Sequence, residues 1–200
     1  MKFNSQTRIR YKTIRNLIGN VKNKTLLDIG CGGSPISEGV KTLKTIRMDG
    51  VQKYNPDISW NFNKYPWPIQ DRSIDLIIAG EILEHMFTPI KFLKECNRIL
   101  KKNGEIIISV PNICSFKNRF KVLFNQLPEG CAFPSDDESY ERHIIDFNSA
   151  SLRKILLESG FRVLNQKSNG IILHSRLIWP VFLTPASFGE TLIVKAVKEK

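Results

Sequence analysis

Short and almost continuous apolar runs punctuate the chain. Each early run ends at a glycine, an acid or a proline, as Ile29 does before Gly30 and Met48 before Asp49. Continuous rather than alternating apolar residues are typical of parallel strands that are buried on both faces. The pattern predicts strands at residues 25–29, 45–48, 58–60, 73–79, 105–110, 161–164 and 190–197.

Amphipathic segments lie between these runs. They predict helices at about 5–18, 36–43, 89–101, 116–124 and 149–157, with expected N-caps at Ser5, Ser34, Thr88 and either Ser149 or Ser151. The first helix carries basic residues and no acid, which leaves two interpretations of its polar face: contact with a ligand carboxylate or an acceptor, or simple solvation. Strand and helix alternate up to residue 111, which predicts an α/β fold with a parallel sheet between two layers of helices.

The stretch from Thr25 to Pro35 organises the rest of the chain. Its strand breaks into Gly30-Cys31-Gly32-Gly33, where backbone N–H groups can face a ligand without an obstructing Cβ. A dinucleotide fingerprint needs a glycine where this chain has Pro35. The carboxylate of Asp28, just before the turn, disfavours a phosphate but suits an ammonium and a sulfonium. The pattern therefore favours S-adenosylmethionine over NAD.

Polar residues follow the other predicted strands at their carboxyl ends. Asp49 comes about 20 residues after the glycine turn, where an acid accepts two hydrogen bonds from a ribose diol. Asn61 and the pair Gly80-Glu81 stand at the ends of the next two strands. Ligands of parallel sheets bind beyond the carboxyl ends of the strands, so these motifs predict one site.

The chain totals set the class of protein. Two hundred residues are enough for one domain, and 42% hydrophobic with 24% charged residues is ordinary for a globular protein. We find no secretory leader and no membrane-length apolar run, and the four scattered cysteines predict reduced thiols in the cytoplasm. The net charge of +11 leaves two interpretations, an anionic partner such as RNA or a lysine-rich solvated surface.

Several motifs together resemble the class I S-adenosylmethionine-dependent methyltransferases. Leu27 to Gly33 is similar to their first motif, Met48-Asp49 to the second, and Asn61 to Asn63 to the third, which usually has Asp where Asn61 stands. The run from Asp75 to His85 is similar to their fourth-strand signature. The resemblance is closest to small, single-domain members that modify small molecules, lipids or glycans.

The resemblance implies a Rossmann-like three-layer α/β/α fold with a mostly parallel seven-stranded sheet, its last strand antiparallel. We expect a single domain over 1–200, with a basic helix at about 5–18 and an insertion or lid at about 113–146. The residues expected to bind the donor are Asp28, Gly30, Cys31, Gly32, Asp49, Gly50, Asn61, Phe62, Ala79, Gly80 and Glu81.

Methyl transfer from a sulfonium needs mainly proximity and orientation, and an oxygen acceptor adds the need for a general base. His143 and His85 are the candidate bases, because a neutral imidazole has the right pKa near pH 7. Glu81 and His85 are four residues apart, which puts them on one face of an expected short helix.

Two other functions remain open at this stage. Glu81, Glu84, His85 and His143 resemble the metal ligands of the small-RNA 2′-O-methyltransferases of the Hen type, although no metal is expected on the first interpretation. The chain is alternatively a non-catalytic, donor-binding partner subunit. We expect the acceptor to be a small molecule, lipid or glycan that is methylated at oxygen. No motif in the sequence identifies this acceptor further, and none indicates the oligomeric state.

Overall fold

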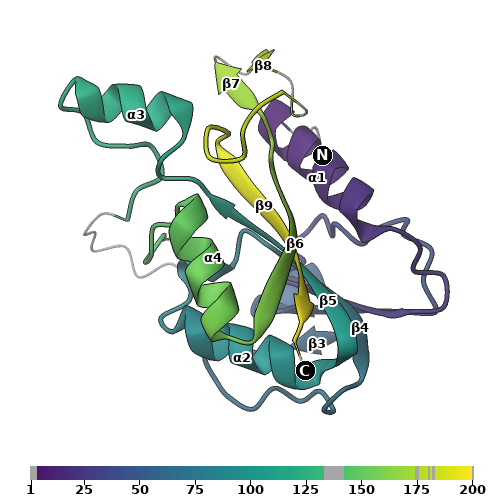
Figure 1. Cartoon of the computed structure of the whole chain (residues 1–200). Coiled ribbons are helices and arrows are strands. Elements are labelled where there is room, and N and C mark those ends of the chain that lie inside the picture. Colours follow the sequence, from purple (N-terminus) through teal and green to yellow (C-terminus); the bar gives the residue numbers. More distant parts are fainter. Residues whose placement is uncertain (1–3, 133–141, 174–175, 180, 182, 200) are drawn as a thin grey trace.

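A computed structural model describes the chain over residues 4–132, 142–173, 176–179, 181 and 183–199. At its centre lies a seven-stranded sheet with helices on both faces (Figure 1). The predicted three-layer, Rossmann-like architecture is confirmed.

The sheet has one antiparallel strand. The strands stand in the order β3 (Ile58–Ser59), β2 (Lys44–Asp49), β1 (Thr25–Ile29), β4 (Ile74–Gly80), β5 (Leu100–Pro111), β9 (Thr191–Lys198) and β6 (Phe161–Ser168). Neighbours from β3 to β5 are parallel, whereas β9 is antiparallel to both β5 and β6. From β1 the chain moves outward to β2 and β3 and then returns to β4. This reversal places a ligand crevice at the carboxyl ends of β1 and β4.

The two faces of the sheet have separate cores. Ile77 and Ala79 of β4 pack in the cluster that includes α2 (Pro89–Ile99) and α4 (Ser149–Glu158). Leu76 and Ile78 pack instead in the cluster that includes α1 (Ser5–Ile18). Because successive side chains of a strand point to opposite faces, a continuous apolar run is what a strand covered on both sides needs.

The predicted helix at 36–43 is wrong. The segment forms consecutive turns, in which the N–H of Glu38 donates to Pro35 at 3.2 Å and the N–H of Val40 donates to Ser37 at 3.0 Å. The Arg15 side chain of α1 donates to the carbonyls of Ile36 and Glu38 at 3.2 and 2.9 Å. These carbonyls are satisfied by α1 and do not build a helical ladder.

Asparagines rather than serines cap two helices. Asn4 accepts from the Thr7 N–H and begins α1, so Ser5 is the first helical residue rather than the cap. Asn148 caps α4, and Ser151 reaches back to the Asn148 N–H to complete a capping box. Thr88 precedes α2 but makes no side-chain capping bond.

The boundary between α2 and β5 lies earlier than expected. The helix ends at Ile99, and Leu100 already has extended backbone angles and pairs with Ile74 of β4. The Asn103-Gly104 pair lies inside β5, where Asn103 has a φ of 59°.

The described chain also contains two 3-10 helices, η1 (Gln52–Tyr54) and η2 (Leu83–His85), and a separate hairpin of β7 (Ile171–Leu173) and β8 (Arg176–Trp179). The helix α3 (Phe116–Leu123) lies within the predicted insertion at about 113–146, of which residues 133–141 fall outside the described residues. The described part of the apolar segment 171–188 contains the hairpin.

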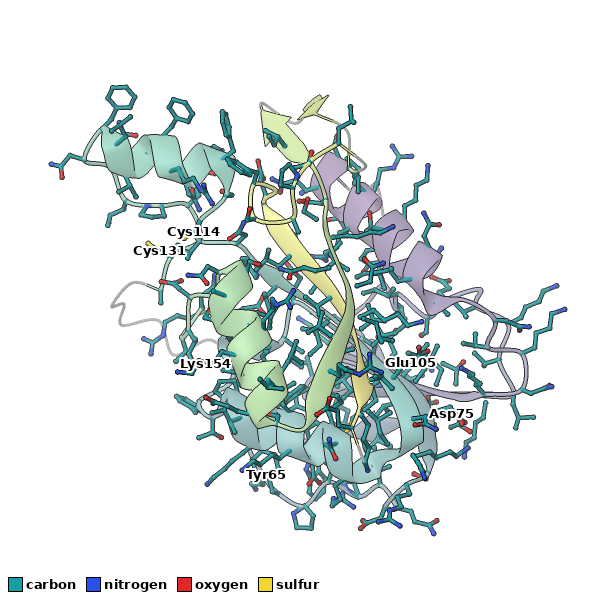
Figure 2. All side chains as sticks on the ribbon, viewed as in Figure 1. Tyr65, Asp75, Glu105, Cys114, Cys131 and Lys154 are labelled. Carbon is teal, nitrogen blue, oxygen red and sulfur yellow. The ribbon has the colours of Figure 1, made fainter. Side chains whose placement is uncertain are left out.

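Charges at the amino ends of the strands are paired. Asp75 accepts from the Thr25 N–H and from Lys101, and Glu105 lies 3.1 Å from the ammonium of Lys195. Figure 2 shows Asp75 and Glu105 at the end of the molecule away from α3. In the described part of the chain, no helix combines the length and apolar character that crossing a bilayer requires.

Candidate active site

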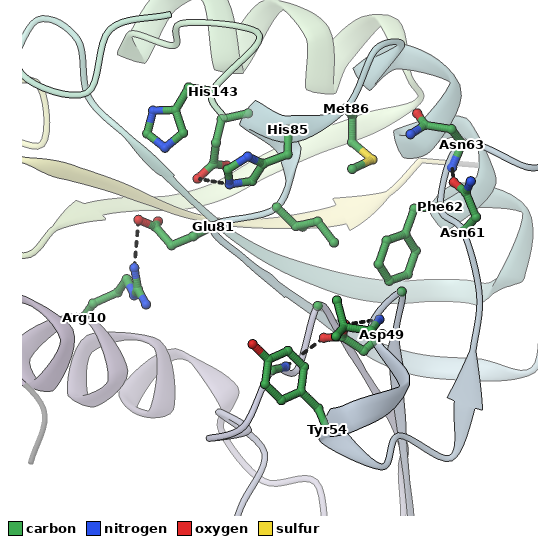
Figure 3. A pocket seen from close by; sticks show the side chains of 16 residues that line it. Arg10, Asp49, Tyr54, Asn61, Phe62, Asn63, Glu81, His85, Met86 and His143 are labelled. Atoms are coloured by element: carbon green, nitrogen blue, oxygen red, sulfur yellow. Dashed lines mark hydrogen bonds and ion pairs between the residues drawn. The ribbon is translucent and has the colours of Figure 1, made fainter. Parts of the chain in front are cut away.

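A cavity of about 470 Å³ opens at the carboxyl ends of the central strands (Figure 3). This volume falls within the usual range for sites that bind small molecules and cofactors. The lining residues come from α1, the glycine turn, the end of β2 and the segment after it, the segments after β3 and β4, and the segment before α4 (Ser149–Glu158). They are Arg10, Gly30, Gly32, Asp49, Gly50, Val51, Tyr54, Asn61, Phe62, Asn63, Glu81, Ile82, Glu84, His85, Met86 and His143.

Asp49 holds the glycine turn in place. Its carboxylate accepts from the backbone N–H of Gly32 and from that of Val51, both at 2.8 Å. Gly30 and Gly32 have φ values of 66° and 54°, which side-chain-bearing residues rarely adopt. A Cβ on Gly30 would also come within 2.8 Å of the Ile82 side chain. The turn therefore depends on both glycines and on the acid at the end of β2.

The cavity has an aromatic end and a charged end. Figure 3 shows Tyr54 and Phe62 near Asp49, whereas Arg10, Glu81, His85 and His143 lie at the opposite side. An aromatic end suits a planar base, and a neighbouring carboxylate suits a diol. The charged end suits the polar tail of a ligand.

Glu81 joins α1 to the end of β4. Its backbone has a φ of 53°, and its carboxylate accepts from the Ser109 hydroxyl at 2.9 Å and lies 2.7 Å from the Arg10 guanidinium. The expected short helix carrying Glu81 and His85 on one face is wrong, since η2 begins only at Leu83. Glu81 is therefore occupied by α1 and does not join the histidines.

Glu84, His85 and His143 form a compact group, with candidate ligand atoms within 4.8 Å of one another. Glu84 is 2% exposed, and neither of its carboxylate oxygens has a hydrogen-bond partner among the described residues. Burial, and next the negative charge of Glu81, raise the pKa of Glu84 well above its ordinary value. The two imidazole rings lie 5.1 Å apart.

Hydrogen bonds orient both imidazoles. Nδ1 of His143 lies 2.6 Å from the Gly130 carbonyl, and Nδ1 of His85 lies 2.9 Å from the Arg142 carbonyl. A carbonyl only accepts, so each Nδ1 carries the proton. In the neutral ring, Nε2 is then the basic nitrogen.

Seven of the residues expected to bind the donor line the cavity: Gly30, Gly32, Asp49, Gly50, Asn61, Phe62 and Glu81. The other four, Asp28, Cys31, Ala79 and Gly80, are not among the lining residues. Asp28 is 1% exposed and accepts from the Ser37 N–H at 2.9 Å, and burial raises its pKa. Burial likewise raises the pKa of the Cys31 thiol to about 12. Direct contact with a ligand stays a prediction for all eleven residues.

Sequence reasoning missed several lining residues, among them Arg10, Tyr54 and Met86. Tyr54 is the last residue of η1, and Met86 directly follows η2. Only Arg10 had a usable signal, because contact with a ligand was one of the two interpretations of the polar face of the basic helix. The sequence does not show which cation of α1 lines the cavity, because that depends on the three-dimensional contact of Arg10 with Glu81.

The family called "Methyltransferase domain" matches residues 3–166 of the chain. The chain belongs to the methyltransferase-domain family. It is a class I S-adenosylmethionine-dependent methyltransferase domain, as the motifs predicted.

Named relatives agree with this assignment. A probable S-adenosylmethionine-dependent methyltransferase of Mycobacterium tuberculosis is 24% identical over 94 residues, which cover 47% of this chain and 29% of that protein. The ubiquinone biosynthesis O-methyltransferase of Coxiella burnetii is 26% identical over 142 residues, covering 61% of this chain and 60% of that one. The chain thus spans less than two thirds of either relative.

A solved S-adenosylmethionine-dependent methyltransferase from Thermotoga maritima shares the fold. It superposes with a TM-score of 0.70 at 18% identity, covering 96% of this chain and 89% of that chain.

The cavity fits the donor of this family. Asp49 is 6% exposed. It lies beside the glycine turn, which is open, since a Cβ added to Gly32 would meet no protein atom within 4 Å. The cavity has aromatic side chains at one end for a planar base and charged side chains at the other for the polar tail. S-adenosylmethionine is therefore the cofactor that the domain's fold and residues accommodate.

Proposed function

We propose that this chain transfers the methyl group of S-adenosylmethionine to an oxygen of a small-molecule, lipid or glycan acceptor, in the cytoplasm. The observation that carries the proposal is the imidazole pair at the charged end of the cavity, with each basic Nε2 set by a carbonyl at Nδ1. A hydroxyl acceptor loses a proton on methylation, so it needs a base that an acceptor already ionised, such as a thiolate or a carboxylate, does not need. The four free cysteines are consistent with a reducing compartment.

The mechanism assigns separate tasks to the two ends of the cavity. Asp49 and the glycine turn would hold the sugar, Tyr54 and Phe62 the base, and Arg10 and Glu81 the charged tail. When bound, the donor supplies an electrophilic methyl group on a good leaving group. Positioning alone can contribute about 7–11 kcal/mol to such a displacement.

His143 is the preferred base and His85 the second candidate. The Nδ1–H of His143 donates to the Gly130 carbonyl, which leaves Nε2 to take the proton of the acceptor hydroxyl. The buried Glu84 carboxylate lies beside the resulting imidazolium and can stabilise it when Glu84 is ionised. His85 lies closer to Glu84, with 3.9 Å between its Nε2 and the carboxylate. His85 would then orient and share charge rather than accept the acceptor's proton.

The test is methyl transfer from labelled donor to acceptors pooled by class, using wild type and His143→Asn. We expect one pool containing hydroxyl acceptors to be labelled, and the variant to lower kcat by about 10²–10⁴-fold. Binding of S-adenosylhomocysteine by the variant should stay within about twofold of wild type, which controls for folding. Equal turnover by wild type and variant would remove His143 as the base, and labelling confined to amine acceptors would reject the oxygen proposal.

A second candidate function rests on the same three residues. One carboxylate and two imidazoles within 4.8 Å of one another are a donor set that divalent transition metals accept, and the buried oxygens of Glu84 have no hydrogen-bond partner among the described residues. A metal here would support an RNA 2′-O-methyltransferase of the Hen type, to which a charge of +11 is suited. Glu81, the fourth ligand expected from sequence, pairs with Arg10 and does not lie in the group.

Metal removal separates the two functions. RNA methylation that is lost with EDTA, restored by Mn²⁺ and abolished by Glu84→Gln would establish the second. Transfer to a small acceptor that is unchanged by EDTA would support the first and exclude a catalytic metal.

A further inference from the structure

Helix α3 is packed with its polar side inward. Asn118 is its one buried residue in the structure, and the helix follows directly from the carboxyl end of β5. The Asn118 side chain donates to the Glu129 carbonyl at 3.2 Å and accepts from the Glu129 N–H at 2.9 Å. These bonds fasten α3 to the loop that follows it, and they fix which side of the helix faces the protein.

The opposite side of α3 is apolar and exposed. Positions 116, 120, 123 and 124 share one helical face by their spacing, and all are Phe or Leu. Phe120, Leu123 and Phe124 are 49%, 74% and 70% exposed, whereas Phe116 is partly covered by Phe188. Figure 2 shows side chains of α3 projecting away from the sheet. A surface helix normally buries its apolar stripe, so this orientation indicates an external partner.

Cations border this apolar face on both sides. Lys117 and Lys121 lie on one side, where both approach the Glu129 carboxylate, and Arg119 lies on the other, over the Phe188 ring at 4.4 Å. Three cations against one acid leave the described part of this surface positive. Phe116, Phe120 and Phe124 also line a groove of about 370 Å³ together with the two lysines.

We propose that α3 docks this protein on an anionic membrane surface. Phenylalanine and leucine at the centre of a short helix with lysine and arginine at its borders are the features of an interfacial helix. Insertion of the apolar face would bring the cations to the level of anionic headgroups. A second copy of this chain is a poorer occupant, because each copy carries a net charge of +11 and the same basic border.

Docking through α3 would bring the end of the sheet that carries the cavity towards the membrane. The helix follows β5, and the cavity opens at the carboxyl ends of the neighbouring strands, at the same end of the sheet. The proposal does not depend on the methyl-transfer reaction, because membrane binding can be measured without donor or acceptor.

The experiment is flotation of the full chain with vesicles of phosphatidylcholine alone or with added phosphatidylglycerol. We expect binding to the anionic vesicles at least about tenfold stronger, and weakened by salt. Acids follow α3 in the sequence at residues 136–138, so this comparison decides whether the positive charge or the acids dominate. Equal binding to both vesicles, or none to either, overturns the proposal.

Matched variants assign the binding to α3. Phe120→Ser with Phe124→Ser should lower anionic-vesicle binding by about tenfold or more, because it removes the inserted apolar surface. Leu43→Ser with Leu157→Ser removes two apolar side chains that are 72% and 65% exposed elsewhere, and it should leave binding unchanged. Unchanged binding of S-adenosylhomocysteine would show that each variant is folded.

Two further results would reject the assignment. If both double variants lose the same amount of binding, α3 is not the docking element. If wild type is a dimer that the Phe120 and Phe124 changes convert to a monomer, and it does not bind vesicles, the apolar face joins two copies instead.

Discussion

The guanidinium of Arg10 lies 2.7 Å from the carboxylate of Glu81. The pair closes one wall of the cavity, because Arg10 belongs to α1 and Glu81 follows the carboxyl end of β4 (Figure 3). A helix that precedes the first strand is thus part of the proposed donor site. The Arg10 Nε is buried and has no hydrogen-bond partner among the described residues, so this side chain has hydrogen-bonding capacity to spare.

We expect Arg10→Ala to weaken donor binding by about tenfold, because it removes a charge-assisted hydrogen bond to the donor carboxylate. Calorimetry with S-adenosylhomocysteine measures this directly, since the product retains the carboxylate. Arg8→Ala, an exposed change of the same type on the same helix, is the matched control and should bind normally. Equal affinities for both variants would show that α1 only covers the cavity.

Stability should depend on pH through Glu84. Its raised pKa means that the folded chain keeps a proton that the unfolded chain releases near the ordinary pKa of 4.5. The folded state binds more protons in this window, so the free energy of unfolding falls as pH rises from about 4.5 towards the raised pKa. Glu84→Gln cannot titrate and should gain stability over wild type progressively as the pH rises.

Urea unfolding of both proteins between pH 4 and pH 8 tests this expectation. Subtracting the unfolding free energy of wild type from that of the variant cancels the contribution of Asp28, because its raised pKa is common to both proteins. Parallel curves would show that Glu84 is ionised in the folded state. If metal added at neutral pH stabilises wild type and not the variant, the three-residue group binds that metal.

Removing Glu95 should destabilise the loop that carries Asn61 and Phe62. Glu95 is 8% exposed, accepts from the Trp67 N–H at 2.5 Å and binds Arg98 at 2.6 Å. Glu95→Ala leaves the buried Trp67 N–H without its acceptor and removes one of the two carboxylates that pair with Arg98, which we expect to cost about 2–4 kcal/mol of unfolding free energy. The neighbouring exposed change Lys94→Ala should stay within about 0.5 kcal/mol of wild type. Equal midpoints in chemical denaturation would contradict this assignment.

The sheet was predictable because burial on both faces leaves a local record. Ile77 and Ile78 must both be apolar, since one faces α2 and α4 and the other faces α1. The polar residues that end these strands, such as Asp49, could be assigned to one site from topology alone. Neither inference needed a contact between distant side chains.

The errors arose where distant contacts override local signals. Ser34 and Pro35 are good helix-starting residues, yet Arg15 takes up the carbonyls that the predicted helix would have used. Glu81 and His85 have helical spacing, but Ser109 and Arg10 hold Glu81 in a backbone conformation outside any helix. No local pattern records a partner that lies many residues away.

We expect the donor to bind over the glycine turn that Asp49 holds. Calorimetric titration of S-adenosylhomocysteine into Asp49→Ala measures this. Loss of the acceptor for the Gly32 and Val51 N–H groups and for the sugar should weaken binding by about 100-fold. The control is Asp57→Ala, which removes a carboxylate bound to Arg47 outside the cavity lining and should change affinity less than about twofold. Wild-type affinity in Asp49→Ala, or equal losses in both variants, would contradict the account.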